Sequence, residues 1–326
     1  MSNKTKKPLN YLEDPHLSKK TKEFLKIVNA ADKPVESLPV ADARNVLVEA
    51  QASVRVNVSG IDESKKTITA DGYKIKLNIV RPKGVKEKLP VFIFIHGGGW
   101  VLGDYPTHKR LVRDLVVESG FASVFVDYSL SPEAKFPQAV NEVFAATKWV
   151  AEHGDEIDVD GKRLAVVGNS AGGNMAVVTS IKALENKGPK INAQILLWPV
   201  TDANMDYESF KLFGEDRFLT TSLMKWMADL YISKPEDAKS VYFSPILAPL
   251  KQLKGLPPTL ITVAENDILR DEGEEFGRKL DEAGVNVTTV RFNNAIHDWG
   301  ILNGLADTPE TKALIQLSAA TLKKYL

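Results

Sequence analysis

Two glycine-rich motifs, each directly after an apolar run, most constrain what this chain can fold into. HGGGW at residues 96–100 follows Val91–Ile95, and GNSAGG at residues 168–173 follows Arg163–Val167. The second motif matches Gly-x-Ser-x-Gly, the strand-to-helix elbow that presents a serine to a substrate. Glycine suits such a turn because neighbouring side chains would collide. The pair predicts a reactive serine, Ser170, and a loop whose backbone N–H groups can receive an oxyanion.

Each motif also has an ordinary interpretation. Gly-x-Ser-x-Gly occurs by chance in roughly one chain in ten of this length, and three adjacent glycines can form a flexible loop. The surroundings of Ser170 favour the functional interpretation. Leu164–Val167 is a short apolar run typical of a buried strand. Apolar residues then recur at helical spacing, at Met175, Val178, Ile181 and Leu184.

Composition limits the class of protein. The chain has 326 residues, with 44% hydrophobic and 26% charged residues, and its 42 basic residues balance 42 acidic ones. A neutral total argues against a nucleic-acid surface. The absence of cysteine excludes disulfides and thiolate catalysis. We expect no secretory signal and no membrane helix, because no apolar run is long enough, and a cytoplasmic location is the default.

From Pro90 onward the pattern alternates between strand and helix, which predicts an α/β fold with a mostly parallel central sheet flanked by helices. Strands are predicted at Val91–Ile95, Ala122–Asp127, Arg163–Val167, Ala193–Trp198, Thr259–Ala264 and Val287–Phe292. Helices are predicted at Thr107–Ser119, Gln138–His153, Ala171–Asn186, Glu272–Ala283 and Pro309–Tyr325. Residues 1–50 are polar and helical in character, whereas Arg44–Arg81 is strand-like.

Residues 202–240 interrupt this alternation. The segment carries no strand pattern, and its aromatic and methionine residues recur at helical spacing. It is either a pair of core helices or a cap over a pocket at the strand ends, and we favour the cap. The predicted organisation is an N-terminal part of the cap at 1–50, a core at 51–201, inserted cap helices at 202–240 and a second core part at 241–326.

A serine hydroxyl needs a base, usually a histidine oriented by a carboxylate. His297 follows the last predicted strand and is the only histidine after Ser170, which suits the order serine, acid, histidine. Asp267 follows the strand before it and is the favoured acid. Asp202 is the runner-up, and Asp298 is disfavoured because neighbours on a loop rarely face each other. The remaining histidines are assigned to the surface (His16, His108, His153) or to the glycine loop (His96).

These motifs together resemble those of the hormone-sensitive-lipase-like family of bacterial carboxylesterases, within the α/β-hydrolase superfamily. The resemblance covers about Pro90 to Leu302. It rests on HGGGW at 96–100, VDYSLSPE at 126–133, GNSAGGN at 168–174, ENDILRDEG at 265–273 and AIHDW at 295–299. The family implies an α/β-hydrolase fold whose helical cap is formed by the first 50 residues and the segment after Asp202.

The resemblance also implies roles for these residues. Ser170 would attack an ester carbonyl, His297 would carry the proton and Asp267 would orient His297. The oxyanion would be received by backbone N–H groups, those of Gly98, Gly99 and Ala171. The family implies no metal and no organic cofactor. It also implies a homodimer as one option, formed through the last strand and helix.

Four positions depart from the usual family pattern. Asn169 stands where Asp is common, Ser129 where Arg is frequent, Ile268 where Pro is frequent and Asp298 where Gly is common. No departure removes a predicted catalytic group. They bear on the pH profile and on details of the pocket.

The leading hypothesis is a serine carboxylesterase for small, neutral esters with short-to-medium acyl chains. Candidate pocket residues are Trp100, Trp198, Met224 and Trp226, each of which could equally be plain core. A non-catalytic small-molecule receptor of this fold is the main alternative from another class, because fold does not settle function. Amides, lactones or long-chain lipids are further substrate options.

Overall fold

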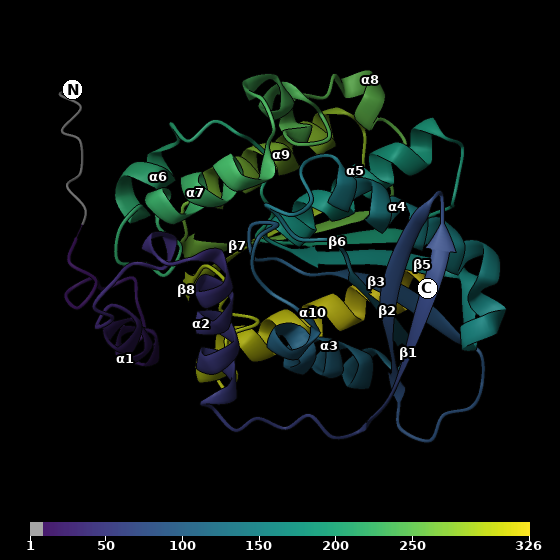
Figure 1. The fold of residues 1–326 in the computed structure, drawn as a ribbon, viewed down its shortest axis with the longest axis horizontal. Coiled ribbons are helices and arrows are strands. Elements are labelled where there is room, and N and C mark those ends of the chain that lie inside the picture. Colours follow the sequence, from purple (N-terminus) through teal and green to yellow (C-terminus); the bar gives the residue numbers. More distant parts are fainter. Residues whose placement is uncertain (1–8) are drawn as a thin grey trace.

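In the computed structural model, which describes residues 9–326, eight strands form one sheet in the order β1-β2-β4-β3-β5-β6-β7-β8 (Figure 1). The strands are β1 Ile61–Ala70, β2 Tyr73–Pro82, β3 Leu89–Ile95, β4 Ala122–Asp127, β5 Val159–Asn169, β6 Ala193–Leu197, β7 Thr259–Asn266 and β8 Val287–Ile296. The β1–β2 and β2–β4 pairs are antiparallel. All pairs from β4 through β3 to β8 are parallel. The predicted mostly parallel sheet is therefore confirmed.

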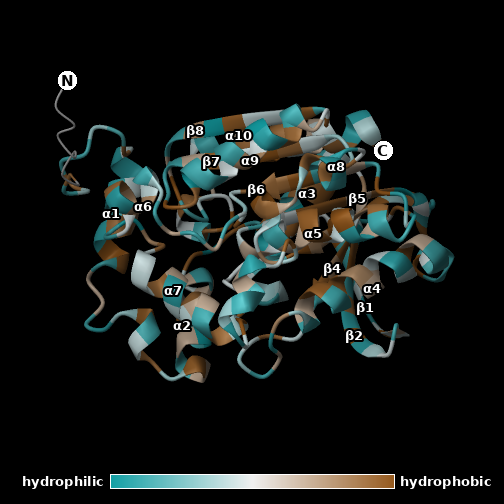
Figure 2. Ribbon diagram, turned by 90° about the horizontal axis from the view of Figure 1, so that it is seen from above, coloured by the Kyte–Doolittle hydropathy of each residue, from teal (hydrophilic) through white to brown (hydrophobic). Residues whose placement is uncertain are grey.

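Helices cover both faces of the sheet. The α-helices are α1 Lys19–Val28, α2 Val40–Ala52, α3 Tyr105–Ser119, α4 Gln138–His153, α5 Ala171–Glu185, α6 Glu208–Phe213, α7 Thr221–Tyr231, α8 Leu250–Leu253, α9 Arg270–Glu282 and α10 Pro309–Tyr325. Helices α3 and α10 lie on one face, and α4, α5 and α9 lie on the other (Figure 1). Figure 2 shows the apolar central strands enclosed between these layers.

Burial on both faces explains the continuous apolar runs. Along β3, Val91, Ile93 and Ile95 belong to the core under α4 and α5. Phe92 and Phe94 point the other way, into the core shared with α3 and α10. Successive side chains of a strand point to opposite faces, so a central strand with two covered faces carries apolar residues at most of its positions.

Most element boundaries agree with the pattern of the sequence, and α4 and α10 begin and end at the predicted residues. The strand-like interpretation of Arg44–Arg81 is wrong at its start, because residues 44–52 belong to α2. Pro39 precedes this helix, and its buried residues Ala43 and Gln51 are two turns apart, on one face. Tertiary contacts of that face decide the conformation here.

The two segments predicted to form the cap lie on the same side of the molecule, where α1, α2, α6 and α7 gather in both views (Figures 1 and 2). Arg217, between α6 and α7, forms an ion pair with Asp14 ahead of α1. Phe24 of α1 packs against Phe218. Residues 1–8 of the predicted N-terminal cap lie outside the described residues. The cap assignment and its boundaries remain predictions.

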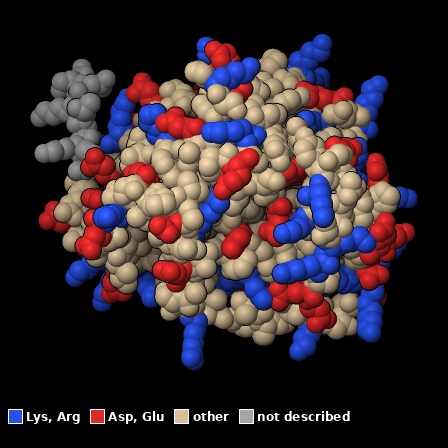
Figure 3. Space-filling model, viewed as in Figure 1, with Lys and Arg blue, Asp and Glu red and all other residues tan. Residues whose placement is uncertain are grey.

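The face of the molecule in Figure 3 carries basic and acidic side chains interspersed over its whole area. Within residues 9–326, every helix is too short or too polar to cross a lipid bilayer. The expected homodimer stays a prediction, and β8, at one edge of the sheet, and α10 are the elements it would use.

Candidate active site

The three predicted catalytic residues each begin the connection after a strand. Ser170 follows β5, Asp267 follows β7 and His297 follows β8. These strands belong to the parallel part of the sheet, so their carboxyl ends meet at one edge. The HGGGW loop follows β3, which pairs with β5 in parallel, and it therefore reaches the same edge. Four segments far apart in the chain therefore converge on one place.

Ser170 lies at a strained turn between β5 and α5, with φ of +53°. The flanking glycines allow this turn because the backbone passes itself closely. A Cβ at Gly168 would lie 2.2 Å from the Gly172 carbonyl oxygen, and one at Gly172 would lie 2.0 Å from the Ile95 carbonyl oxygen. Both distances are far shorter than van der Waals contact. The spacing Gly-x-Ser-x-Gly thus has a steric cause in this fold.

Ser170, His297 and Asp267 form a continuous hydrogen-bonded relay. His297 Nε2 lies 3.1 Å from Ser170 Oγ, and His297 Nδ1 lies 2.7 Å from Asp267 Oδ2. All three side chains are buried. The other Asp267 oxygen, Oδ1, accepts the backbone N–H of Leu269 at 3.0 Å, which fixes the carboxylate. A neutral His297 in this arrangement can accept the Ser170 proton.

The electrostatics of His297 suit a proton carrier. Burial alone would lower the pKa of His297, but the negative charges of Asp267 and Asp298, with the Asp267 hydrogen bond, outweigh burial and raise it. A raised pKa means that the imidazolium form is stabilised inside the protein. That form arises when His297 takes up a proton.

The two alternative acids lie elsewhere. Asp202 accepts a hydrogen bond from the Tyr207 hydroxyl at 2.8 Å and does not contact His297. Asp298 is closer than expected, with Oδ1 3.9 Å from His297 Nε2, so the expectation that this neighbour faces away is wrong. Its Oδ1 accepts hydrogen bonds from Trp198 Nε1 at 2.7 Å and Asn169 Nδ2 at 3.1 Å. Asp267 alone bonds to Nδ1.

The HGGGW loop is held from several sides. Gly98 and Gly99 adopt left-handed backbone conformations, with φ of +101° and +58°. The Gly97 N–H donates to Asn169 Oδ1 at 3.0 Å, which ties the loop to the residue before Ser170. His96 Nδ1 lies 2.8 Å from the Gly97 carbonyl oxygen, as expected for a histidine that holds the loop. Ala171 begins α5, where the first N–H groups have no partner within a helix.

The predicted surface location of His108 is wrong. His108 is buried on the inner face of α3, where its ring packs 5.4 Å from His96 and 6.1 Å from Phe94. Burial lowers the pKa of His108 well below its usual value, and burial lowers that of His96 to about 4. Both rings are therefore neutral supports of the loop at neutral pH.

The candidate pocket residues are placed differently from one another. Trp100 is buried and stacks on Tyr231 of α7, with ring centroids 4.4 Å apart. Trp198 is buried behind His297 against Trp299. Met224 is buried in α7, and Trp226 of the same helix is half-buried. Their role in substrate binding remains a prediction.

One residue near the site was not among the candidates. Met227 of α7 covers Gly99, since a Cβ at Gly99 would lie 2.1 Å from Met227 Sδ. Met227 is buried, and Ser170 is only 4% exposed. The insert therefore closes over the glycine loop. The helical repeat of methionines pointed to a buried face, but only the fold shows which methionine meets the loop.

The remaining departures from the family pattern have local explanations. Ser129 donates through its backbone N–H and its hydroxyl to the buried Glu142. Arg44 of α2 supplies a guanidinium nearby, which pairs with Glu133 and donates to the Ser131 carbonyl oxygen. Ile268 is fully buried and packs into the core under α4 and α5.

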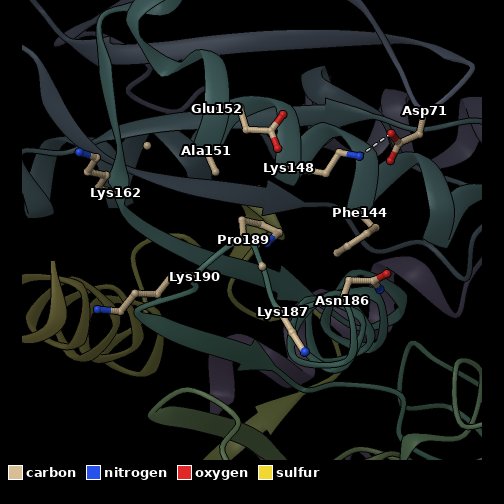
Figure 4. A pocket seen from close by; sticks show the side chains of 12 residues that line it. Asp71, Phe144, Lys148, Ala151, Glu152, Lys162, Asn186, Lys187, Pro189 and Lys190 are labelled. Atoms are coloured by element: carbon tan, nitrogen blue, oxygen red, sulfur yellow. Dashed lines mark hydrogen bonds and ion pairs between the residues drawn. The ribbon is translucent and has the colours of Figure 1, made fainter.

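A cleft of about 760 Å³ lies away from the relay of Ser170, His297 and Asp267, none of which lines it (Figure 4). Gly161 at the start of β5 lines it, together with α4 residues and the loop after α5, whereas Ser170 follows the other end of β5. Its rim carries lysines, of which Lys148 pairs with Asp71. The cleft therefore lies near the amino-terminal ends of the parallel strands, and the relay lies at their carboxyl ends. Within residues 9–326, no group of three or more acidic, histidine or cysteine side chains could hold a metal ion.

Comparison with known proteins identifies the family. Residues 92–301 match the model of a family described as alpha/beta hydrolase fold. The chain belongs to this α/β-hydrolase family. A thermostable esterase from Pseudomonas putida superposes with a TM-score of 0.95 and 54% identity, over 96% of this chain and 98% of the other. Carboxylesterase NlhH of Mycobacterium tuberculosis is 33% identical over 80% of this chain and 82% of its own length.

Two further relatives are each associated with a small molecule. An ethyl acetate hydrolase of Pseudomonas putida is 29% identical over 82% of this chain and 85% of its own length. A variant of the esterase rPPE with one serine replaced by alanine is solved in complex with (S)-Ac-CPA, and it is 53% identical with a TM-score of 0.95, over 96% of this chain and 98% of the other. Another rPPE variant has a tryptophan replaced by histidine. The present α/β hydrolase is thus a carboxylic ester hydrolase of the hormone-sensitive-lipase-like type, as its motifs predict.

Proposed function

We propose that this esterase cleaves short-to-medium-chain carboxylic esters through an acyl-enzyme intermediate on Ser170. The observation that carries the proposal is the buried relay from Ser170 Oγ through His297 to Asp267, with distances of 3.1 and 2.7 Å. In the first half-reaction Oγ bonds to the ester carbonyl carbon as its proton moves to His297 Nε2. That proton then passes to the leaving alkoxide when its C–O bond breaks. Water repeats the sequence on the acyl-enzyme.

The oxyanion formed at each step would be received by the backbone N–H groups of Gly98, Gly99 and Ala171. Support comes from their placement, since the glycine loop and the N-terminus of α5 lie side by side and Asn169 ties them together. N–H donors that are already oriented cost no reorganisation during the reaction, and losing one typically lowers the rate about 100- to 1000-fold.

The cap favours small substrates. Met227 lies against Gly99, and Trp100 packs under Tyr231 of the same helix, so little room is left over the oxyanion loop. The relative that hydrolyses ethyl acetate suits this size. In rPPE, the substituted serine and the substituted tryptophan are separated by as many residues as Ser170 and Trp198 are here, which supports the assignment of Ser170 as nucleophile.

The test is hydrolysis of p-nitrophenyl esters from acetate to palmitate by wild type, Ser170→Ala and the control Ser180→Ala. Ser180 is a buried serine of the same helix, and its hydroxyl donates to the Ala176 carbonyl oxygen at 3.2 Å. We expect turnover that peaks at short chains, a loss of at least about 10⁴-fold in Ser170→Ala and near-wild-type turnover in the control. Wild-type turnover in Ser170→Ala would refute the mechanism. A folded wild type without turnover at any length would favour the receptor alternative.

A further inference from the structure

Resting on the proposed function, we propose that Asp298 is a positioning residue for His297. The Asp298 carboxylate would stabilise the His297 imidazolium from the Nε2 side. Hydrogen bonds from Asn169 and Trp198 would keep this carboxylate from accepting the proton on Nε2. Asp267 occupies the Nδ1 side, so His297 lies between two carboxylates with different tasks. Asp267 bonds to the ring, and Asp298 acts on it through space.

The first observation is a buried chain of hydrogen bonds that ends on Asp298. The Gly97 N–H donates to Asn169 Oδ1 at 3.0 Å, and Asn169 Nδ2 donates to Asp298 Oδ1 at 3.1 Å. Trp198 Nε1 donates to the same oxygen at 2.7 Å. The chain joins the last residue of β5 to the segments that follow β3, β6 and β8. An amide at position 169 is needed, because it accepts at one end and donates at the other.

The second observation is the distance from Asp298 to His297. Oδ1 lies 3.9 Å from Nε2, beyond hydrogen-bond range but close enough for a strong charge interaction in a buried site. The proton on Nε2 must later pass to the leaving group. A carboxylate in direct contact would compete for it. Two N–H donors on Oδ1 restrain the carboxylate, so it stabilises the positive charge without closing on Nε2.

The third observation is that the backbone accepts an aspartate here at some cost. Asp298 has φ of +63°, a left-handed conformation that glycine adopts freely and that Asp and Asn tolerate better than most residues. The backbone at position 298 would therefore suit glycine better than aspartate, yet the chain has an aspartate there. An Asp298→Asn variant keeps this backbone tolerance and an Oδ1 acceptor, and it removes only the charge.

Few charged groups bear on His297. Asp267 and Asp298 raise its pKa, and the Ser170 hydroxyl, which faces it from the start of α5, carries no charge. Glu272 of α9 is the other buried carboxyl near Asp267, and burial raises its pKa well above its usual value, which favours its neutral form. Removing the Asp298 charge therefore isolates one interaction.

The test is the pH dependence of kcat and kcat/KM for p-nitrophenyl acetate in wild type and Asp298→Asn. The acid limb of kcat/KM reports the pKa of the base in the free enzyme. Removing a neighbouring negative charge lowers that pKa, so we expect the limb to move to lower pH by about one unit. The same charge stabilises the imidazolium of the transition state, so plateau kcat should fall about tenfold.

Two further variants serve as comparisons, one that relocates the charge within the hydrogen-bonded chain and one that removes a distant charge. The exchange variant Asn169→Asp/Asp298→Asn retains an acceptor for the Gly97 N–H and one for Trp198 Nε1. It moves the negative charge from position 298 to position 169, the next member of the hydrogen-bonded chain. We expect its acid limb to lie between those of wild type and Asp298→Asn. Asp307→Asn removes a fully exposed carboxylate and should leave the limb unchanged.

An acid limb that stays in place in Asp298→Asn, or a plateau kcat that rises, would overturn the inference. A lower melting temperature with an unchanged limb would mean that Asp298 is merely structural, which also overturns it. These outcomes differ from failure of the proposed function, in which wild type itself would show no turnover that depends on Ser170.

Discussion

The ion pair between Asp14 and Arg217 offers a sharp test of how the N-terminal segment is joined to the inserted helices. Arg217 donates to Asp14 Oδ2 at 2.9 Å, and the two side chains are only 3% and 5% exposed. Arg217 also donates to the Leu9 carbonyl oxygen at 3.0 Å, and Asp14 Oδ1 accepts the His16 N–H at 2.9 Å. The pair is therefore buried and supported on both sides.

Replacing Asp14 by alanine leaves the Arg217 guanidinium buried without its counter-charge. Such a change typically costs about 3–5 kcal/mol, because a charge in a poorly polarisable interior cannot recover its lost hydration. The exposed pair Lys225–Asp229 in α7 is the matched control, with side chains 67% and 59% exposed. Water screens that pair, so Asp229→Ala should cost only about 0.3–0.5 kcal/mol.

The measurement is the free energy of unfolding in urea at pH 7 for wild type, Asp14→Ala, Asp229→Ala and the double variant Asp14→Ala/Arg217→Met. The double variant removes the stranded charge and keeps an apolar side chain of similar length, so it should recover most of the loss. A cost of less than about 1 kcal/mol for Asp14→Ala would contradict the presence of a stranded buried charge. A double variant no more stable than Asp14→Ala would contradict it as well.

Two further predictions concern Glu272 and Gly99. Burial raises the pKa of Glu272, so wild type loses stability as pH rises from the unfolded-state value of about 4.3 towards the raised folded-state value, whereas Glu272→Gln does not titrate. The stability of the variant relative to wild type should therefore grow with pH by up to about 1.4 kcal/mol per unit in urea unfolding, and a pH-independent difference would contradict this. Gly99→Ala places a Cβ 2.1 Å from Met227 Sδ and disturbs the oxyanion loop, so kcat/KM for p-nitrophenyl acetate should fall about 100-fold or more. Adding Met227→Ala should restore part of the loss, and an unaffected Gly99→Ala enzyme would show that the loop does not receive the oxyanion.

Local patterns predicted the main elements and the residues of the relay. Period-2 burial and helical spacing are properties of short segments, so α4 and α10 could be placed without any knowledge of their neighbours. The relay followed from chain order, since Ser170, Asp267 and His297 each follow a strand, and the parallel strands of one sheet have their carboxyl ends on the same side. The glycines at 168 and 172 were visible as a motif, but only the contact of Gly168 is local, because a Cβ at Gly172 would meet the Ile95 carbonyl oxygen at the end of β3.

Local pattern was misleading where burial depended on distant partners. Residues 44–52 carry a strand-like pattern but form the end of α2, because Gln51 donates to the Thr107 and Ile301 carbonyl oxygens in the core. His108 was assigned to the surface, but α3 turns it towards His96. In both cases the deciding contact lies more than ten residues away or across an element boundary, so no short window contains it.

By itself, the sequence determined the class of fold, the order of the motifs and the identity of the three residues in the relay. Only the tertiary structure decided that Met227 covers Gly99 and that Asn169, Trp198 and Asp298 share one hydrogen-bonded chain. The physical reason is that these contacts join the ends of different strands. Loop conformation and side-chain rotamers set them, and neither leaves a periodic trace in the sequence.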